Sequence, residues 1–111
     1  MPLSDRAIQI LNLMKRGKPD DLVFPGAKRG VPLSDQALLE CLRGLRSGMT
    51  VHGFRSSFRD WVGETTSYPA DLAELALAHA IKNKSEAAYR RRKGLDRRRP
   101  MMADWASYLG R

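Results

Sequence analysis

Residues 51–62 read VHGFRSSFRDWV, and the spacing of their side chains predicts a helix with two distinct faces. Four apolar side chains recur at helical intervals, so we expect them on one buried face: Phe54, Phe58, Trp61 and Val62. On the same helical count, three basic side chains share a different face: His52, Arg55 and Arg59. The aromatic residues therefore belong to the core, and the basic face is available for chemistry.

Capping residues predict two helices before this stretch. The first runs from Ser4 to about Arg16, where Ser4 is a good N-cap and Gly17 and Pro19 end the helix. The phrase PLSDRA at 2–7 is echoed by PLSDQA at 32–37, where the second helix begins. The apolar residues of that second helix form an expected inward stripe: Leu38, Cys41, Leu42 and Leu45. The loop between the helices holds a short apolar run, 22–24, that we interpret as one buried strand-like segment.

Three further helices are predicted after residue 62. Pro69 opens one through DLAELALAHA, a short helix spans roughly 85–92 until Gly94 breaks it, and a last helix begins at about Pro100. The expected apolar stripe of the first of these helices comprises Leu72, Leu75 and Ala76, with His79 at the i+7 position. The last helix carries Met101, Trp105, Tyr108 and Leu109. The predicted fold is mainly α, with about six helices and at most one or two short strands.

Length and composition restrict the class of protein. A chain of 111 residues fits one small domain or part of a larger one. The single cysteine, Cys41, excludes an internal disulfide and fits a reducing compartment. No apolar run is long enough to cross a membrane, and the start lacks the features of a leader peptide. We therefore expect a soluble cytoplasmic protein with no membrane partner.

The basic charge is concentrated in one segment. Residues 82–99 contain nine Lys/Arg against two acids, which accounts for +7 of the net charge of +8. Such a cluster creates a field suited to phosphate groups, and with nucleic acid it supplies affinity that does not depend on base sequence. A solvated basic helix face is an equally good interpretation of the charge alone.

Residues able to carry chemistry are few. The two histidines and one cysteine have no carboxylate at ligand spacing, and no glycine-rich phosphate loop follows a strand, so we expect neither a metal nor a cofactor. The remaining set suits phosphoryl transfer: His52, Arg55, His79 and Tyr89. Arginine grips phosphate through paired N–H groups, histidine exchanges protons near neutral pH, and a tyrosine hydroxyl can attack phosphorus. Taken singly, His79 fits a hydrogen-bonded core histidine and Tyr89 a packing residue.

Taken together, these residues match a known pattern. HGFR at 52–55, LALAH at 75–79 and EAAYRR at 86–91 resemble the C-terminal half of the catalytic domain of tyrosine recombinases, specifically phage-type integrases. The resemblance covers essentially the whole chain. It implies that Tyr89 attacks a scissile DNA phosphate to form a 3′-phosphotyrosyl link, while Arg55 and His79 bind its oxygens and His52 assists proton movement. The surrounding basic residues would then hold the DNA backbone: Lys82, Lys84, Arg90, Arg91 and Arg92.

The resemblance also implies groups that this chain does not supply. The family uses another arginine and a lysine on a β-hairpin, and both would precede Met1. We therefore expect residues 1–111 to be a partial catalytic domain, without its N-terminal part or the arm- and core-binding domains, and to cleave DNA poorly or not at all. The implied partners are double-stranded DNA attachment sites and other integrase protomers in the bacterial nucleoid, with no small-molecule substrate.

Two other interpretations remain open at the level of sequence. The chain is alternatively a non-catalytic basic helical module that binds nucleic acid, because the basic run serves both functions equally well. Binding of segment 82–99 to a membrane surface is weaker, since the segment lacks large apolar residues. The last helix packs either on a neighbouring protomer or on its own core.

Overall fold

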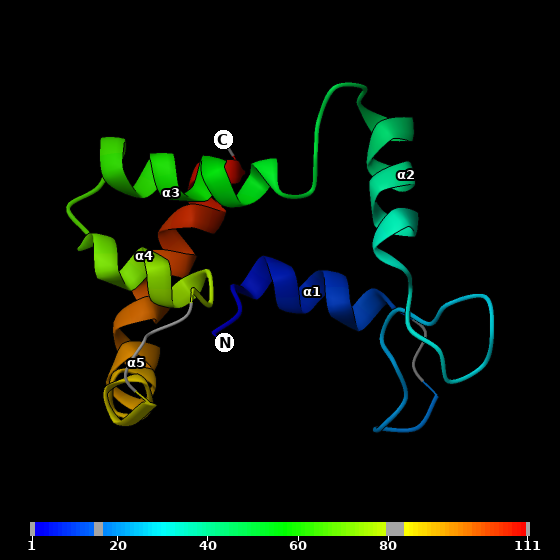
Figure 1. Ribbon diagram of the computed structural model, residues 1–111, viewed down its shortest axis with the longest axis horizontal. Coiled ribbons are helices and arrows are strands. Elements are labelled where there is room, and N and C mark those ends of the chain that lie inside the picture. Colours follow the sequence, from blue (N-terminus) through cyan, green and yellow to red (C-terminus); the bar gives the residue numbers. More distant parts are fainter. Residues whose placement is uncertain (1, 15–16, 80–83, 111) are drawn as a thin grey trace.

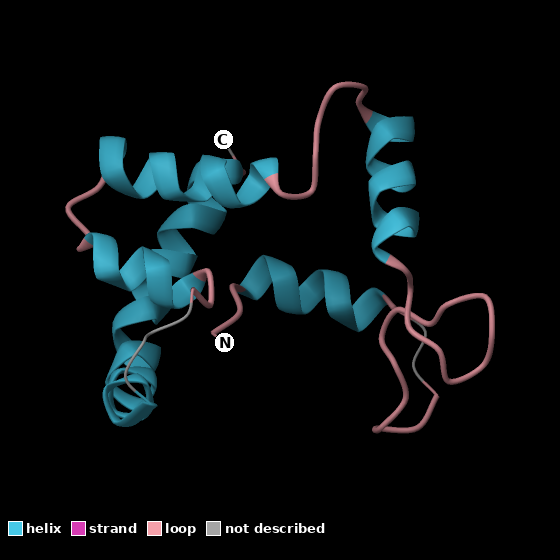
Figure 2. Cartoon of the chain, in the orientation of Figure 1, coloured by secondary structure: helices cyan, strands magenta, loops and turns pink. Residues whose placement is uncertain are grey.

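The computed structural model describes residues 2–14, 17–79 and 84–110, with the side chains of 84–93 outside the description. These ranges hold five helices: α1 (Asp5–Leu13), α2 (Asp35–Leu45), α3 (Gly53–Thr65), α4 (Ala70–Ala76) and α5 (Lys84–Leu109) (Figure 1). The same ranges contain no strand (Figure 2). One isolated bridge joins Pro25 and Pro32. The predicted mainly-α class is confirmed, with five helices in place of about six. None of these helices has the length and apolar character to cross a membrane.

The two N-terminal helices begin where their capping serines predict. The Ser4 hydroxyl accepts a hydrogen bond from the Ala7 N–H at 3.3 Å, and the Ser34 hydroxyl accepts one from the Ala37 N–H at 3.1 Å. Each serine thereby satisfies an N–H group that the first turn of a helix leaves without a partner. The repeated PLSD sequence therefore places the same N-cap residue, serine, before both helices.

The predicted inward stripe of α2 is wrong. Leu38 is 49% exposed and Leu45 is 78% exposed, and no residue of α1 or α2 is buried. The physical reason is that, in the described part of the chain, no helix covers this face: α2 stands apart from the unit that α3, α4 and α5 form (Figure 1). The radius of gyration of 16.1 Å exceeds the value of about 13 Å for a compact domain of this length. The arrangement is correspondingly open.

The core lies entirely between α3, α4 and α5. Its buried apolar residues are Phe58, Trp61, Val62, Leu72, Ala73 and Met101. Trp105 packs against this cluster, with its ring centroid 5.0 Å from that of Trp61 and 5.4 Å from that of Phe58 in an edge-to-face pair. The predicted apolar face of α3 is right except at Phe54, which is 49% exposed because it lies in the first turn, one turn before the packed residues.

The predicted break at Gly94 and helix start at Pro100 are wrong, because α5 runs through both. A methyl group at position 94 would lie 3.2 Å from Leu75 Cδ1, so glycine allows α5 to approach α4 closely. Pro100 lacks the N–H that would bond to the carbonyl of Asp96. Directly after it, however, Met101 is completely buried. Burial of Met101 in the core offsets the lost hydrogen bond and keeps the helix continuous.

The predicted buried strand-like segment at 22–24 is also wrong. Leu22 and Phe24 are exposed, and the segment is a series of bends. The Gly26 N–H donates to the Val31 carbonyl at 2.7 Å, which closes a small loop. Proline at both bridge positions removes the N–H donors that a longer ladder would need.

Candidate active site

His52 and Arg55 lie at the start of α3, where it faces α2. His52 occupies the N-cap position of α3 and is exposed, and Arg55 follows in the first turn. Together they line a hollow of about 470 Å³ whose other wall comes from α2, including Leu38 and Arg43. Arg43, in the last turn of α2, is a basic residue of this hollow that the sequence patterns did not single out. Sequence patterns point only weakly to Arg43, because a single arginine on an exposed helix face is common in proteins.

Arg55 also reaches the end of α4. Its terminal guanidinium nitrogen, Nη2, donates to the carbonyl of Leu77 at 2.5 Å across 22 positions of sequence. Leu77 is the C-cap of α4 and lies two residues before His79. The contact therefore joins the HGFR stretch to the LALAH stretch.

The way α4 ends determines where His79 lies. The Ala78 N–H donates to the Leu75 carbonyl at 3.2 Å, and the His79 N–H donates to the Glu74 carbonyl at 3.1 Å. These two bonds are those of a Schellman motif, which requires a left-handed residue after the C-cap. Ala78 supplies it with a φ of 56°, the only non-glycine positive φ in the described ranges. His79 is thus turned off the apolar stripe of α4, where helical spacing had placed it, and is exposed.

Glu74 connects His79 to the basic face of α3. One carboxylate oxygen, Oε2, contacts Nδ1 of His79, and the other, Oε1, lies 3.0 Å from Nε of Arg59. Arg59 is one turn beyond Arg55 on α3. The two helices are therefore linked twice on this side, by Arg55 to the end of α4 and by Arg59 through Glu74. Sequence reasoning missed Glu74.

A second arginine engages the same end of α4 from the other side. Nη1 of Arg98 on α5 donates to the Leu75 carbonyl at 3.1 Å, and its Nε donates to the Gly94 carbonyl at 3.1 Å. The last carbonyls of a helix lack internal partners and carry partial negative charge, so guanidinium groups are favourable there. Arg55 and Arg98 together hold the end of α4 between α3 and α5.

The remaining predicted site residues fall outside the described side chains. Tyr89 lies within α5, as do Lys84, Arg90, Arg91 and Arg92, but their side chains are not described. Lys82 lies outside the described residues altogether. Among the described residues, no group of three or more His, Cys, Asp and Glu is placed to hold a metal ion. Of the four predicted catalytic residues, the structure therefore describes the side chains of His52, Arg55 and His79.

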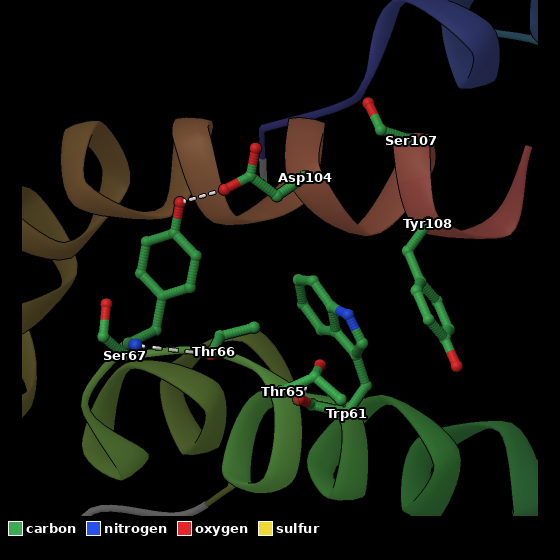
Figure 3. A pocket seen from close by; sticks show the side chains of 8 residues that line it. Trp61, Thr65, Thr66, Ser67, Asp104, Ser107 and Tyr108 are labelled. Carbon is green, nitrogen blue, oxygen red and sulfur yellow. Dashed lines mark hydrogen bonds between the residues drawn. The ribbon is translucent and has the colours of Figure 1, made fainter. Parts of the chain in front are cut away.

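A separate cavity of about 570 Å³ lies between the end of α3 and α5, away from these residues. Trp61 and Tyr108 project into it from the two facing helices, as Figure 3 shows. At its edge the Tyr68 hydroxyl donates to a carboxylate oxygen of Asp104 at 2.5 Å. This hydrogen bond to Asp104, with burial and the negative charge of Asp104, raises the pKa of Tyr68 above its ordinary value.

Comparison with known proteins identifies relatives of nearly the whole chain. This chain is 38% identical to the prophage integrase IntA of Escherichia coli (strain K12), over 98% of this chain and 27% of that protein. It is 34% identical to the integrase of Enterobacteria phage P4 and 35% identical to that of Shigella phage Sf6, again over 98% of this chain, covering 26% and 29% of those proteins. No family model matches the chain, and no solved structure matches it significantly.

The predicted resemblance to phage-type integrases is therefore confirmed, since 98% of the chain aligns with a stretch of each of these proteins. The chain spans between about a quarter and three-tenths of the length of these relatives.

Proposed function

We propose that this chain carries the C-terminal part of the catalytic domain of a tyrosine recombinase, which integrates or excises phage or genomic-island DNA. The similarity to integrases supports DNA rearrangement as the general function. The observation that carries the finer proposal is the hydrogen bond from Arg55 to the Leu77 carbonyl. It brings the predicted phosphate-binding arginine into contact with the segment that bears His79.

In this proposal Arg55 is the main phosphate ligand. A guanidinium has five N–H donors in a fixed fork, so one bond to Leu77 anchors the group and leaves others for a phosphate oxygen. His79 contacts a second non-bridging oxygen from the end of α4. The negative charge that grows on these oxygens during attack is then met by donors already in place.

The proposed reaction is a transesterification. The Tyr89 oxygen bonds to phosphorus as the bond from phosphorus to the 5′ oxygen breaks, and the 3′ end remains linked to the protein. His52 assists removal of the phenolic proton, and the leaving 5′ oxygen takes up a proton to become a hydroxyl. A 5′ hydroxyl from the partner duplex reverses the step, so the energy of the bond is conserved without ATP.

We expect the 111-residue polypeptide alone to cleave DNA weakly. The resemblance implies a further arginine and a hairpin lysine, and we assign no residue of this chain to either role. Loss of an arginine from a phosphoryl-transfer site lowers the rate by about 10³-fold or more. The proposed partners are attachment-site DNA and other protomers, with the protein on bacterial DNA in the cytoplasm.

The test is formation of a covalent protein–DNA adduct on nicked suicide duplexes. The chain is compared with a version extended by the N-terminal half of the catalytic domain, each with Tyr89→Phe and with Tyr108→Phe as a matched control on the same helix. We expect an adduct in the extended protein that is lost only in Tyr89→Phe. No adduct in the extended protein, or an adduct that survives Tyr89→Phe, contradicts the assignment.

A non-catalytic module that binds nucleic acid is the second candidate. Arg97 and Arg99 are exposed on α5, and they favour backbone contacts whether or not Tyr89 is a nucleophile. Salt-sensitive DNA binding by the extended protein, without any adduct, is the result that this candidate predicts.

A further inference from the structure

We propose that Glu74 is a positioning residue that fixes the ring of His79 through Nδ1 and presents its other nitrogen, Nε2, to the phosphate. This inference rests on the proposed function of His79. Glu74 has no role in the proposed function above. Its positioning role follows from its contacts with His79 and Arg59 at the end of α4.

The backbone brings Glu74 and His79 together. In the Schellman motif that ends α4, they occupy the two positions that the hydrogen bond from the His79 N–H to the Glu74 carbonyl joins. Proteins commonly place an apolar contact between side chains at these positions. Here a carboxylate faces an imidazole instead, so the turn that terminates the helix also aligns a polar pair.

The carboxylate is held from its other side. Oε1 of Glu74 is shielded from solvent and makes no hydrogen bond, yet it lies 3.0 Å from Nε of Arg59. The guanidinium therefore balances the charge of this oxygen without an aligned N–H. Because Arg59 projects from α3, the carboxylate is fixed relative to the helix that carries Arg55.

The contact determines which nitrogen of His79 carries a proton. An imidazole nitrogen that faces a carboxylate is a donor, so Nδ1 carries the proton and Nε2 is directed away from Glu74. In the neutral ring Nε2 then offers a lone pair, and in the doubly protonated ring it donates. Only the doubly protonated ring can hold Glu74 and a phosphate oxygen at the same time. In that ring Glu74 accepts from Nδ1, and the N–H of Nε2 is left for a phosphate oxygen.

Nitrogen-15 spectra of the 111-residue chain labelled at histidine test the contact directly. The chain has only two histidines, so His52 is an internal reference in the same sample. At a pH where both rings are neutral, we expect His79 to show a proton mainly on Nδ1. Glu74→Met should abolish this preference, because methionine has similar size and helix propensity but no acceptor of comparable strength. Glu74→Gln should retain part of it, since the amide oxygen still accepts.

Two results overturn the inference from these spectra. One is a His79 ring with the proton on Nε2 in the unaltered chain, and the other is an identical His79 spectrum in Glu74→Met. Glu64→Gln, which alters an exposed glutamate of α3, is the matched control and should leave both histidines unchanged. A change at His52 equal to that at His79 would indicate general unfolding and also counts against the inference.

Adduct formation in the extended protein tests the role in catalysis. We expect Glu74→Met to slow the adduct by about 10²-fold, the loss that follows when a reacting group is misplaced by about 1 Å, and Glu74→Gln to slow it less. An unchanged rate in Glu74→Met overturns the positioning role while the recombinase function stands. Absence of any adduct in the unaltered extended protein contradicts the recombinase function instead. The nitrogen-15 spectra then still test whether Glu74 contacts Nδ1 of His79.

Discussion

One region of the molecule holds α1 and α2 and the other holds α3, α4 and α5, and both form helices by the same local rules, yet only the second region builds a core. The first region begins both of its helices with a serine cap and repeats apolar residues along each, but buries none of them. The second buries residues from all three of its helices. The comparison shows that capping and periodicity are sufficient for a helix, whereas burial requires a second surface at the right distance.

The candidate site lies on the boundary between these regions. His52 and Arg55 begin the packed region and face the exposed helix α2 across the hollow, whereas His79 lies within the packed region. The position of Arg55 relative to His79 is therefore set by the core, through α3 and α4. Its position relative to Arg43 depends on the loop from 46 to 52.

The largest predicted effect comes from the aromatic core. Trp61→Ala should lower the free energy of unfolding by about 3–5 kcal/mol, because it removes a buried ring that contacts Phe58 and Trp105. Leu45→Ala, in the exposed stripe of α2, should change it by less than about 0.5 kcal/mol. Urea unfolding followed by circular dichroism measures both, and equal effects would contradict the division into two regions.

The next effect concerns Arg98, which helps to hold the end of α4. Arg98→Met should destabilise the packed region by about 1–3 kcal/mol, because the carbonyls of Leu75 and Gly94 lose a charged donor. Arg97→Met is the matched control, since its side chain is exposed. Urea unfolding of the two variants is the measurement. A larger loss in the control would show that the charge of α5, and not the contact with α4, is the cause.

A smaller effect is confined to the first region. Ser34→Ala should weaken α2 by about 1 kcal/mol, because the Ala37 N–H loses its acceptor. We expect less helical signal in circular dichroism but an unchanged urea midpoint for the packed region. Ser34→Asp keeps an acceptor and should preserve the signal. A shift of the midpoint in Ser34→Ala would mean that α2 is coupled to the core after all.

The smallest effect depends on pH. The pKa of Tyr68 is raised in the folded protein, so its bond to Asp104 stabilises the fold fully below the ordinary phenol pKa of about 10, and this stabilisation is lost as the pH rises through the folded value. Tyr68→Phe should therefore be less stable than the unaltered chain at neutral pH. The difference should shrink at strongly alkaline pH. Urea unfolding at the two pH values measures it, and a difference that grows with pH contradicts the assignment.

The sequence was sufficient to predict the helices that depend on local signals. Ser4 and Ser34 marked the starts of α1 and α2, and the spacing of Phe58, Trp61 and Val62 identified the buried face of α3. The break predicted at Gly94 and the helix start predicted at Pro100 are wrong, because packing against Leu75 and around Met101 overrides the low local helix propensity of glycine and proline. The exposed stripe of α2 was unpredictable for the converse reason, since periodicity does not show whether another element covers it.

Less of the site followed from sequence. Glu74 lies five positions before His79, a separation that would place the two on different faces of a continuous helix. They meet because the helix ends at Ala76 and Ala78 takes a left-handed conformation, and alanine gives no signal of such a turn. The contact between Arg55 and Leu77 arises from the packing of α3 on α4. The roles of His52, Arg55, His79 and Tyr89 stay predictions.

The contacts of Gly94 and Arg98 with α4 divide α5 into a held part and an outer arm. Gly94 packs against Leu75 and Arg98 donates to the Leu75 carbonyl, so α5 is attached to α4 from position 94 onward. The outer arm extends about 15 Å from position 84 to position 94, at 1.5 Å per residue. A tilt of about 10° at Gly94 would sweep the far end through about 3 Å, by the same rise per residue. A pull by a polyanion on the outer arm would thus act first on the contact between α4 and α5, while the aromatic cluster beyond it stayed in place.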